Sequence, residues 1–201
     1  MQAITFTELK KRFQSVAGLA TLDATDEFFF LNSLNNRLRD AWTRMDWPEL
    51  INLNSVSISS DATGNYVGST GDKDILEVWN KNPYLDRTAR KIPYNLIDSK
   101  IYLNVDEFIY NNEVHVLEKK SFVPYTETST DIPAIFENYL TSAILSDFYR
   151  GDGQVEQAQR EDGRAEEFLL RQIDRVEKLQ QQNKPTIQSY NNQSQNSLIY
   201  Q

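Results

Sequence analysis

The spacing of apolar positions predicts two helices within residues 1–48 of the chain. The first follows Thr5, which forms a capping-box pattern with Glu8, and it ends at Gly18. The second begins at residues 21–24 and stops at Trp47-Pro48. Its apolar residues step by three or four positions and form one stripe, made of Phe28, Leu31, Leu34, Leu38, Ala41, Trp42 and Met45.

Between residues 49 and 130 the pattern changes to short runs that are typical of strands. These runs occupy residues 55–59, 75–79, 92–97, 100–105 and 112–118. Gly64-Asn65 and residues 68–71 are predicted to be turns, and Asp98-Ser99 is a tight connection between two strands. Because the runs are short and closely spaced, we expect one small antiparallel sheet.

A third, broadly apolar helix is predicted after the Thr- and Ser-rich residues 126–130. Asp131 is placed to cap it, Pro133 lies in its first turn, and Gly151 ends it. Its apolar residues cover two adjacent stripes and are Ile135, Phe136, Tyr139, Leu140, Ala143, Ile144 and Phe148. So wide an apolar face predicts a central, mostly buried helix.

A fourth helix, from about residue 154 to residue 182, carries a heptad-like seam. The seam residues alternate steps of three and four, and are Val155, Ala158, Asp162, Ala165, Leu169, Gln172, Val176 and Leu179. Asp162 and Gln172 interrupt its apolar character. Roughly 28 residues of helix span about 42 Å, which is more than a core of this size needs. We therefore expect the far end to protrude or to pack on a neighbouring molecule.

The last segment, residues 183–201, is rich in Asn and Gln and carries one charge, at Lys184. Its apolar residues are Ile187, Tyr190, Leu198, Ile199 and Tyr200. A terminus of this composition is commonly unstructured. A second interpretation is a segment that becomes ordered against a partner, and the apolar residues favour this one.

Together these elements predict an α+β fold in which residues 1–48 and 131–182 form a helical bundle. Residues 49–130 form a small antiparallel β insertion, and residues 183–201 form an extended C-terminal tail. We expect the third helix to pack on the second in the bundle core. The predicted contacts join Phe136, Tyr139, Leu140 and Ile144 to Phe28, Leu31, Leu38 and Trp42.

The amino-acid composition excludes several classes of function. The 201 residues include 21 Lys and Arg against 29 Asp and Glu, which gives a net charge of −8. This acidic balance argues against a domain that clamps DNA phosphates. The absence of Cys excludes disulfides and thiolate chemistry, and a single His excludes a multi-His metal centre. No apolar run is long enough for a membrane span, and the N-terminus does not have the pattern of a signal peptide.

Candidate chemical motifs are weak. Residues 68–74 superficially resemble a phosphate loop but lack the Gly-Lys-[Ser/Thr] ending, so a hairpin loop is favoured. Asp61, Asp72 and Asp74 could meet a cation, although acidic loops usually face water. His115 lies in a predicted strand, where a structural role is favoured. Because no nucleophile, base and orienting group come together, we expect no enzymatic activity, no cofactor and no metal ion.

The order of elements resembles that of a phage head–tail adaptor, also called a connector or gatekeeper protein. The most specific stretch, residues 132–179, reads IPAIFENYLTSAILSDFYRGDGQVEQAQREDGRAEEFLLRQIDRVEKL. It is similar to the family in its Pro-initiated aromatic helix, its Gly-containing break and its long charged helix with spaced Ala and Leu. The helix from Phe28 to Trp42 and the segment VWNKNPYLDRTARKIPY, residues 78–94, are similar in style.

The resemblance implies a structural virion protein at the head–tail junction, assembled in the host cytoplasm. Some 12 copies would form a ring, by this resemblance, with DNA passing through the lumen without specific binding. The expected partners are the portal protein, a tail or nozzle protein, and further copies of the chain. The tail segment would engage the portal through Ile187, Tyr190, Leu198, Ile199 and Tyr200.

Three alternatives stay open. A tail-completion or tail-tube component would be mostly β, and the predicted helix over residues 154–182 counts against it. A small enzyme could act through carboxylates of the β segment, such as Asp72 or Asp74. A cytosolic helical scaffold or regulatory module would form a small, stable oligomer.

Overall fold

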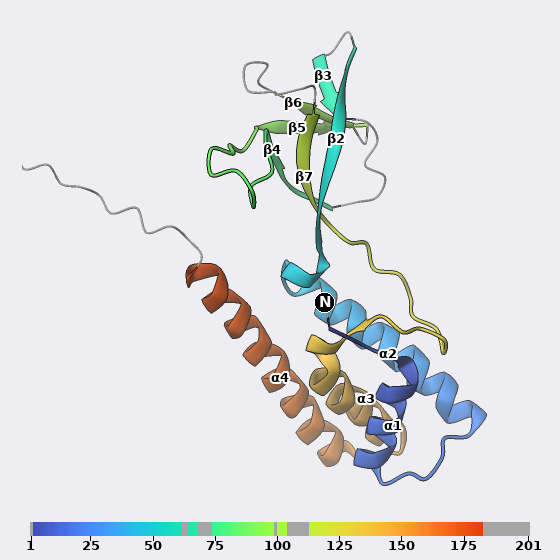
Figure 1. The fold of residues 1–201 in the computed structure, drawn as a ribbon. Coiled ribbons are helices and arrows are strands. Elements are labelled where there is room, and N and C mark those ends of the chain that lie inside the picture. Colours follow the sequence, from blue (N-terminus) through green and yellow to red (C-terminus); the bar gives the residue numbers. More distant parts are fainter. Residues whose placement is uncertain (1, 62–63, 68–73, 99, 104–112, 183–201) are drawn as a thin grey trace, which may run out of the picture.

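The computed structural model describes residues 2–61, 64–67, 74–98, 100–103 and 113–182. The described residues form a helical bundle with a β-sheet at one end of it (Figure 1). The predicted α+β fold is confirmed: two N-terminal and two C-terminal helices flank small antiparallel sheets. The helices are α1 (Phe6–Ala17), α2 (Ala24–Thr43), α3 (Glu137–Gly151) and α4 (Val155–Gln182), with 3₁₀ turns η1 (Pro48–Leu50) and η2 (Ala134–Phe136).

The predicted ends of α1 are confirmed. The Thr5 hydroxyl accepts a hydrogen bond from the Glu8 backbone N–H at 3.1 Å. The Glu8 carboxylate in turn accepts one from the Thr5 N–H at 2.8 Å, which completes the capping box. These hydrogen bonds lower the pKa of Glu8 below its ordinary value. Gly18 ends the helix in the left-handed conformation, with φ of 70°.

The predicted start of α3 is wrong. Ile132–Pro133 forms the short strand β8, which pairs antiparallel with β1 (Ala3–Ile4). This long-range pairing holds residues 132–133 extended, so Asp131 does not cap the helix and Pro133 does not lie in its first turn. The chain passes through η2 and enters α3 at Glu137.

The larger sheet is antiparallel and follows the order β4-β7-β2-β3-β6-β5. Its strands are β2 (Ile51–Asp61), β3 (Gly64–Val67), β4 (Asp74–Trp79), β5 (Tyr94–Ile97), β6 (Lys100–Leu103) and β7 (Glu113–Lys119). Gly64-Asn65, predicted as a turn, begins β3, because this segment pairs with β2 on one side and its continuation pairs with β6 on the other. The predicted turn at residues 68–71 lies outside the described residues. β2 leads from η1 at the bundle into the sheet (Figure 1).

Most of the predicted bundle core is confirmed. The buried residues of that prediction are Leu38, Trp42, Phe136, Tyr139, Leu140 and Ile144, and the partly buried Leu31 packs against them. Phe28 is a correction, because 67% of it is exposed. Phe30 takes the inward position instead, with ring centroids 5.5 Å from Phe6 and 5.1 Å from Phe13. Residues i and i+2 of a helix point about 200° apart around its axis, so Phe28 faces outward when Phe30 faces the core.

The long helix α4 packs along α3 (Figure 1). Its buried apolar residues are Ala158, Ala165, Leu169 and Val176, while the two ends of the predicted seam, Val155 and Leu179, are half exposed or more. Residues 177–180 are all exposed. The last turns of α4 therefore extend past the bundle core, as the length of the helix predicted. Within the described ranges, no helix is both long and apolar enough to cross a membrane.

Candidate binding groove

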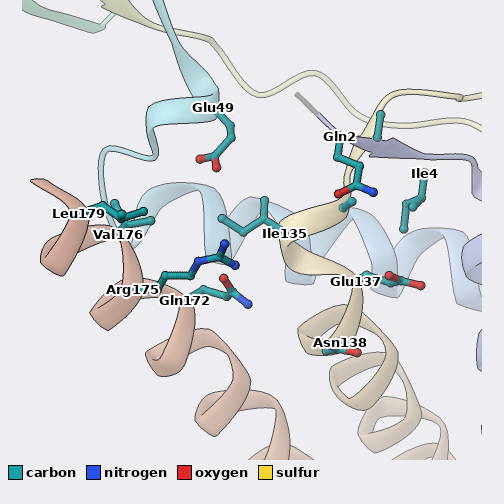
Figure 2. A pocket seen from close by; sticks show the side chains of 12 residues that line it. Gln2, Ile4, Glu49, Ile135, Glu137, Asn138, Gln172, Arg175, Val176 and Leu179 are labelled. Atoms are coloured by element: carbon teal, nitrogen blue, oxygen red, sulfur yellow. The ribbon is translucent and has the colours of Figure 1, made fainter.

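A groove opens where α4 extends past the core. It lies between the C-terminal part of α4 and the η2–β1 region, with η1 at one end (Figure 2). Its volume is about 400 Å³. The lining residues are Gln2, Ala3, Ile4, Glu49, Ala134, Ile135, Glu137, Asn138, Gln172, Arg175, Val176 and Leu179.

Aliphatic side chains from three separate elements form the apolar part of the groove. Ile4 comes from β1, where its pairing with Ile132 fixes the backbone. Ile135 comes from η2, which directly follows β8, and Val176 and Leu179 come from α4. Leu179 is 50% exposed. A partner that covers these side chains would gain roughly 25 cal/mol for each Å² of apolar surface removed from water.

Glu49 gives the groove an unsatisfied acceptor. Its position is fixed by η1, whose neighbour Trp47 is fully buried and donates its indole N–H to the Ala41 carbonyl at 2.8 Å. The Glu49 carboxylate points into the groove (Figure 2). Its Oε2 atom is inaccessible to solvent and receives no hydrogen bond from any described residue. An acceptor left in that state costs about 1–3 kcal/mol, so a donor brought by a partner would relieve a penalty.

Arg175 supplies the opposite charge. It extends from α4 across the groove toward Ile135 (Figure 2) and forms no ion pair with the described part of the chain. Glu137 also lines the groove, but it is already paired with Arg12. The groove therefore offers one free carboxylate and one free guanidinium beside an apolar wall. Such a set suits binding of a protein segment, which presents donors, acceptors and apolar side chains together.

A second polar cluster joins α2, α3 and α4 at a partly exposed face of the bundle. Arg37 of α2 donates to Asp147 of α3, with Nε at 2.9 Å from Oδ2, and to Asp162 of α4 at 3.1 Å. Arg150 pairs with the same two carboxylates, and the Ser33 hydroxyl donates to Asp147. Every charge of this cluster has a partner within it. We therefore assign it to the stability of the bundle.

The electrostatics of this cluster agree with that role. Hydrogen bonding to Asp147 raises the pKa of Arg37 above its ordinary value. Burial pushes the pKa of Asp162 upward, but the hydrogen bonds with Ser146 and Arg150 and the charges of Arg37 and Arg150 outweigh it, and the pKa is lowered. Asp162, which interrupts the predicted seam of α4, is thus held as a carboxylate between two cations.

The candidate residues of the β segment fall partly outside the described residues. Asp74 begins β4 and is exposed, while Asp72 and the side chain of Asp61 lie outside the described residues. His115 of β7 pairs with Ser55 and Trp79 in neighbouring strands, which places it within the sheet. Over the described ranges, no group of three or more His, Asp or Glu side chains could hold a metal ion.

The predicted portal-binding residues Ile187, Tyr190, Leu198, Ile199 and Tyr200 also lie outside the described residues. Comparison with known proteins found no protein-family model and no curated protein that matches the chain.

Proposed function

We propose that the chain is a structural head–tail adaptor: one subunit of a ring that joins a phage portal to the tail. The observation that supports this best is the far end of α4, which extends past the core beside a groove with an unpaired carboxylate and an unpaired guanidinium. In a monomer, a buried acceptor without a donor only lowers the stability of the fold. In an assembly, a neighbouring subunit or partner that closes the groove would remove this penalty by supplying the missing hydrogen-bond donor.

The charge of the chain suits a channel through which DNA passes. The net charge of −8 gives few cations to hold phosphates, and acidic walls repel the DNA backbone. Three ion pairs are internal to α4 and join Arg164 to Glu161, Arg171 to Glu167 and Lys178 to Asp174. Arg160 and Arg175 lie outside these pairs, but the helix carries seven acids against five bases, for a net charge of −2. DNA would then slide through the ring without being bound.

The tail is the proposed portal-binding element. Burying three of its large apolar side chains would contribute roughly 4–9 kcal/mol before ordering costs. Ordering the backbone of residues 184–201 offsets much of that gain, so a single copy binds weakly. Repetition around a ring of about 12 copies, the number implied by the resemblance to adaptors, raises the avidity enough to hold the junction.

The test uses the full chain, the candidate portal of the same virus and a deletion of residues 184–201. Deletion should leave the helical circular-dichroism signal unchanged, because the buried core residues of the described bundle lie between Phe6 and Val176, but abolish co-sedimentation with the portal. A length-matched variant sharpens the test by changing the apolar residues Ile187, Tyr190, Leu198, Ile199 and Tyr200 to Ser. Its control changes Asn191, Asn192 and Gln193 to Ser and should bind as the unmodified chain does.

Two results would contradict the proposal. One is a deletion variant that still binds the portal with unchanged affinity. The other is electron microscopy of virus particles in which the head–tail junction contains no copies of the chain.

A further inference from the structure

The sheet and the helical bundle have separate hydrophobic cores. Buried apolar side chains of the bundle form one cluster, which reaches Leu50, directly before β2. Those of the sheet form another cluster, which includes Val78, Ile101 and Val114. Among the residues that the structure describes, no side chain belongs to both clusters. Hydrophobic burial therefore holds each part together, but no shared core fixes the angle between them.

Two segments of the chain join the two parts. β2 leaves the bundle after Leu50, and β7 leads back to it at Lys120 (Figure 1). Here the Lys120 N–H donates to the Leu50 carbonyl at 2.8 Å, and the Lys120 carbonyl accepts a hydrogen bond from the Trp42 indole N–H at 2.9 Å. We call residues 48–51 and 119–121 the neck. Because a two-stranded ribbon twists more than a wide sheet does, the neck is where the two parts can move against each other.

Lys119 makes a polar side-chain contact across the neck. Its backbone belongs to the sheet, where it pairs with Ile51 of β2 and with Asp74 of β4. Its ammonium group reaches the bundle, where Nζ donates to the Met45 carbonyl at 2.9 Å and lies 3.0 Å from Oδ1 of Asp46. The Lys119 side chain is only 11% exposed. A single residue thus connects the base of the sheet to the end of α2.

The surroundings of this ammonium group suit a contact that can be released. Met45 lies just beyond the C-terminal end of α2, where the helix dipole favours a positive charge. The Asp46 side chain is 55% exposed, so water and other cations reach the ion pair. The contact therefore combines a directional hydrogen bond with a carboxylate that a competing cation can approach.

We propose that the neck is a hinge and that Lys119 is its latch. The ammonium group holds the sheet at the described angle, and its release lets the sheet swing while both cores stay folded. Hinges in proteins are typically a few residues at the ends of elements, as the neck residues are. A cation that competes for Asp46 would release the latch. This inference concerns the chain by itself and does not depend on the adaptor function.

Because the chain contains no Cys, pairs of spin labels can be placed at chosen positions. Leu96→Cys labels β5 of the sheet and Leu170→Cys labels α4, since these side chains are 59% and 54% exposed. Pulsed electron paramagnetic resonance of the full chain then measures the distribution of distances between the sheet and the bundle. A reference pair, Val16→Cys with Leu170→Cys, joins α1 to α4 and reports on the bundle alone.

Lys119→Met removes the ammonium group and retains an apolar side chain of similar length. It should make the sheet–bundle distribution about twofold broader or more, and leave the distribution of the reference pair unchanged. The matched control is Lys91→Met, which removes a lysine that pairs with Glu77 inside the sheet. This control should leave both distributions unchanged. A sheet–bundle distribution that is the same with and without Lys119→Met would overturn the proposal.

A second variant decides the matter if Lys119→Met broadens both distributions and so disturbs the bundle itself. Asp46→Lys changes an exposed carboxylate and places a competing cation beside the ammonium group. Broadening of the sheet–bundle distribution alone would support the latch, and an unchanged distribution would refute it. Neither measurement involves the portal, so failure of the latch leaves the adaptor function standing, and failure of portal binding leaves the latch standing.

Discussion

Phe136→Ala tests whether the bundle is organised around η2. Phe136 is fully buried, and its ring lies 4.9 Å from that of Trp47 in an edge-to-face arrangement at 89°. Truncating a buried Phe costs about 3–5 kcal/mol, of which the aromatic pair contributes about 0.5–1.5 kcal/mol. Because domains of this kind are stable by only about 5–15 kcal/mol, the loss is a large share of the total.

The matched control is Phe28→Ala, the same chemical change on a side chain that is 67% exposed. It should alter the free energy of unfolding by no more than about 0.5 kcal/mol. The pair also tests the assignment of faces on α2, because the sequence pattern alone placed Phe28 in the core.

Urea denaturation followed by Trp fluorescence is the assay, since Trp42 and Trp47 lie in the bundle core. Phe136→Ala should lower the urea concentration at the midpoint without changing the slope of the free energy against urea concentration. The midpoint temperature of thermal unfolding should fall by about 6–20 °C. Equal losses for the two variants, or a loss below about 1 kcal/mol at Phe136, would refute the reasoning.

Three further substitutions should move the free energy of unfolding in different directions, each measured by urea denaturation. Gly18→Ala should cost about 1 kcal/mol, because φ at this helix end is +70°. Gly163→Ala should stabilise by about 0.5–1 kcal/mol, since the site is an exposed interior position of α4 with no atom within 4 Å of the new Cβ. The pKa of Asp162 is lowered by folding, so its contribution is present above the unfolded pKa of about 3.9 and is lost as pH falls through the lowered value. Asp162→Asn should therefore cost about 1 kcal/mol at pH 7 and progressively less below pH 4.

Features determined by neighbours in sequence were predictable. The capping box of Thr5 and Glu8 and the left-handed Gly18 both involve residues within a single turn of the helix end. The Asp23 N-cap of α2 was not predicted but is equally local, because Asp23 accepts hydrogen bonds from the N–H groups of Thr25 and Asp26, both at 2.8 Å. In each case the side chain and the backbone it satisfies are local, so the sequence pattern contains the whole interaction.

Features determined by distant pairing were not predictable. The extended backbone at residues 132–133 depends on β1, which lies more than a hundred residues earlier in the chain. The strand that begins at Gly64 pairs with β6, more than thirty residues later in the chain, although Gly-Asn is an ordinary turn signal. The face of α2 that is buried depends on Phe6 and Phe13 of α1, which select Phe30 and leave Phe28 outside. Local propensity gave no information on these choices.

The two polar interruptions in the seam of α4 show how much a sequence can reveal about a site. Both Asp162 and Gln172 break an apolar repeat, and both lie where the helix makes polar contacts or lines a groove instead of packing apolar side chains. Asp162 is matched by Arg37 and Arg150, so its charge is satisfied within the bundle. Gln172 lines the groove, beside an arginine that no described residue pairs with.

The difference between these two positions lies in their surroundings and not in their own residue types. Polar groups of a folded chain are stable when they have partners within it, as Asp162 does. Where the partners are missing, as for Oε2 of Glu49 across the groove from α4, the simplest physical explanation is that another molecule supplies them. Glu49 and Arg175 are distant in sequence, so no spacing rule could join them. The groove therefore becomes visible only when the fold brings η1 and the far end of α4 together.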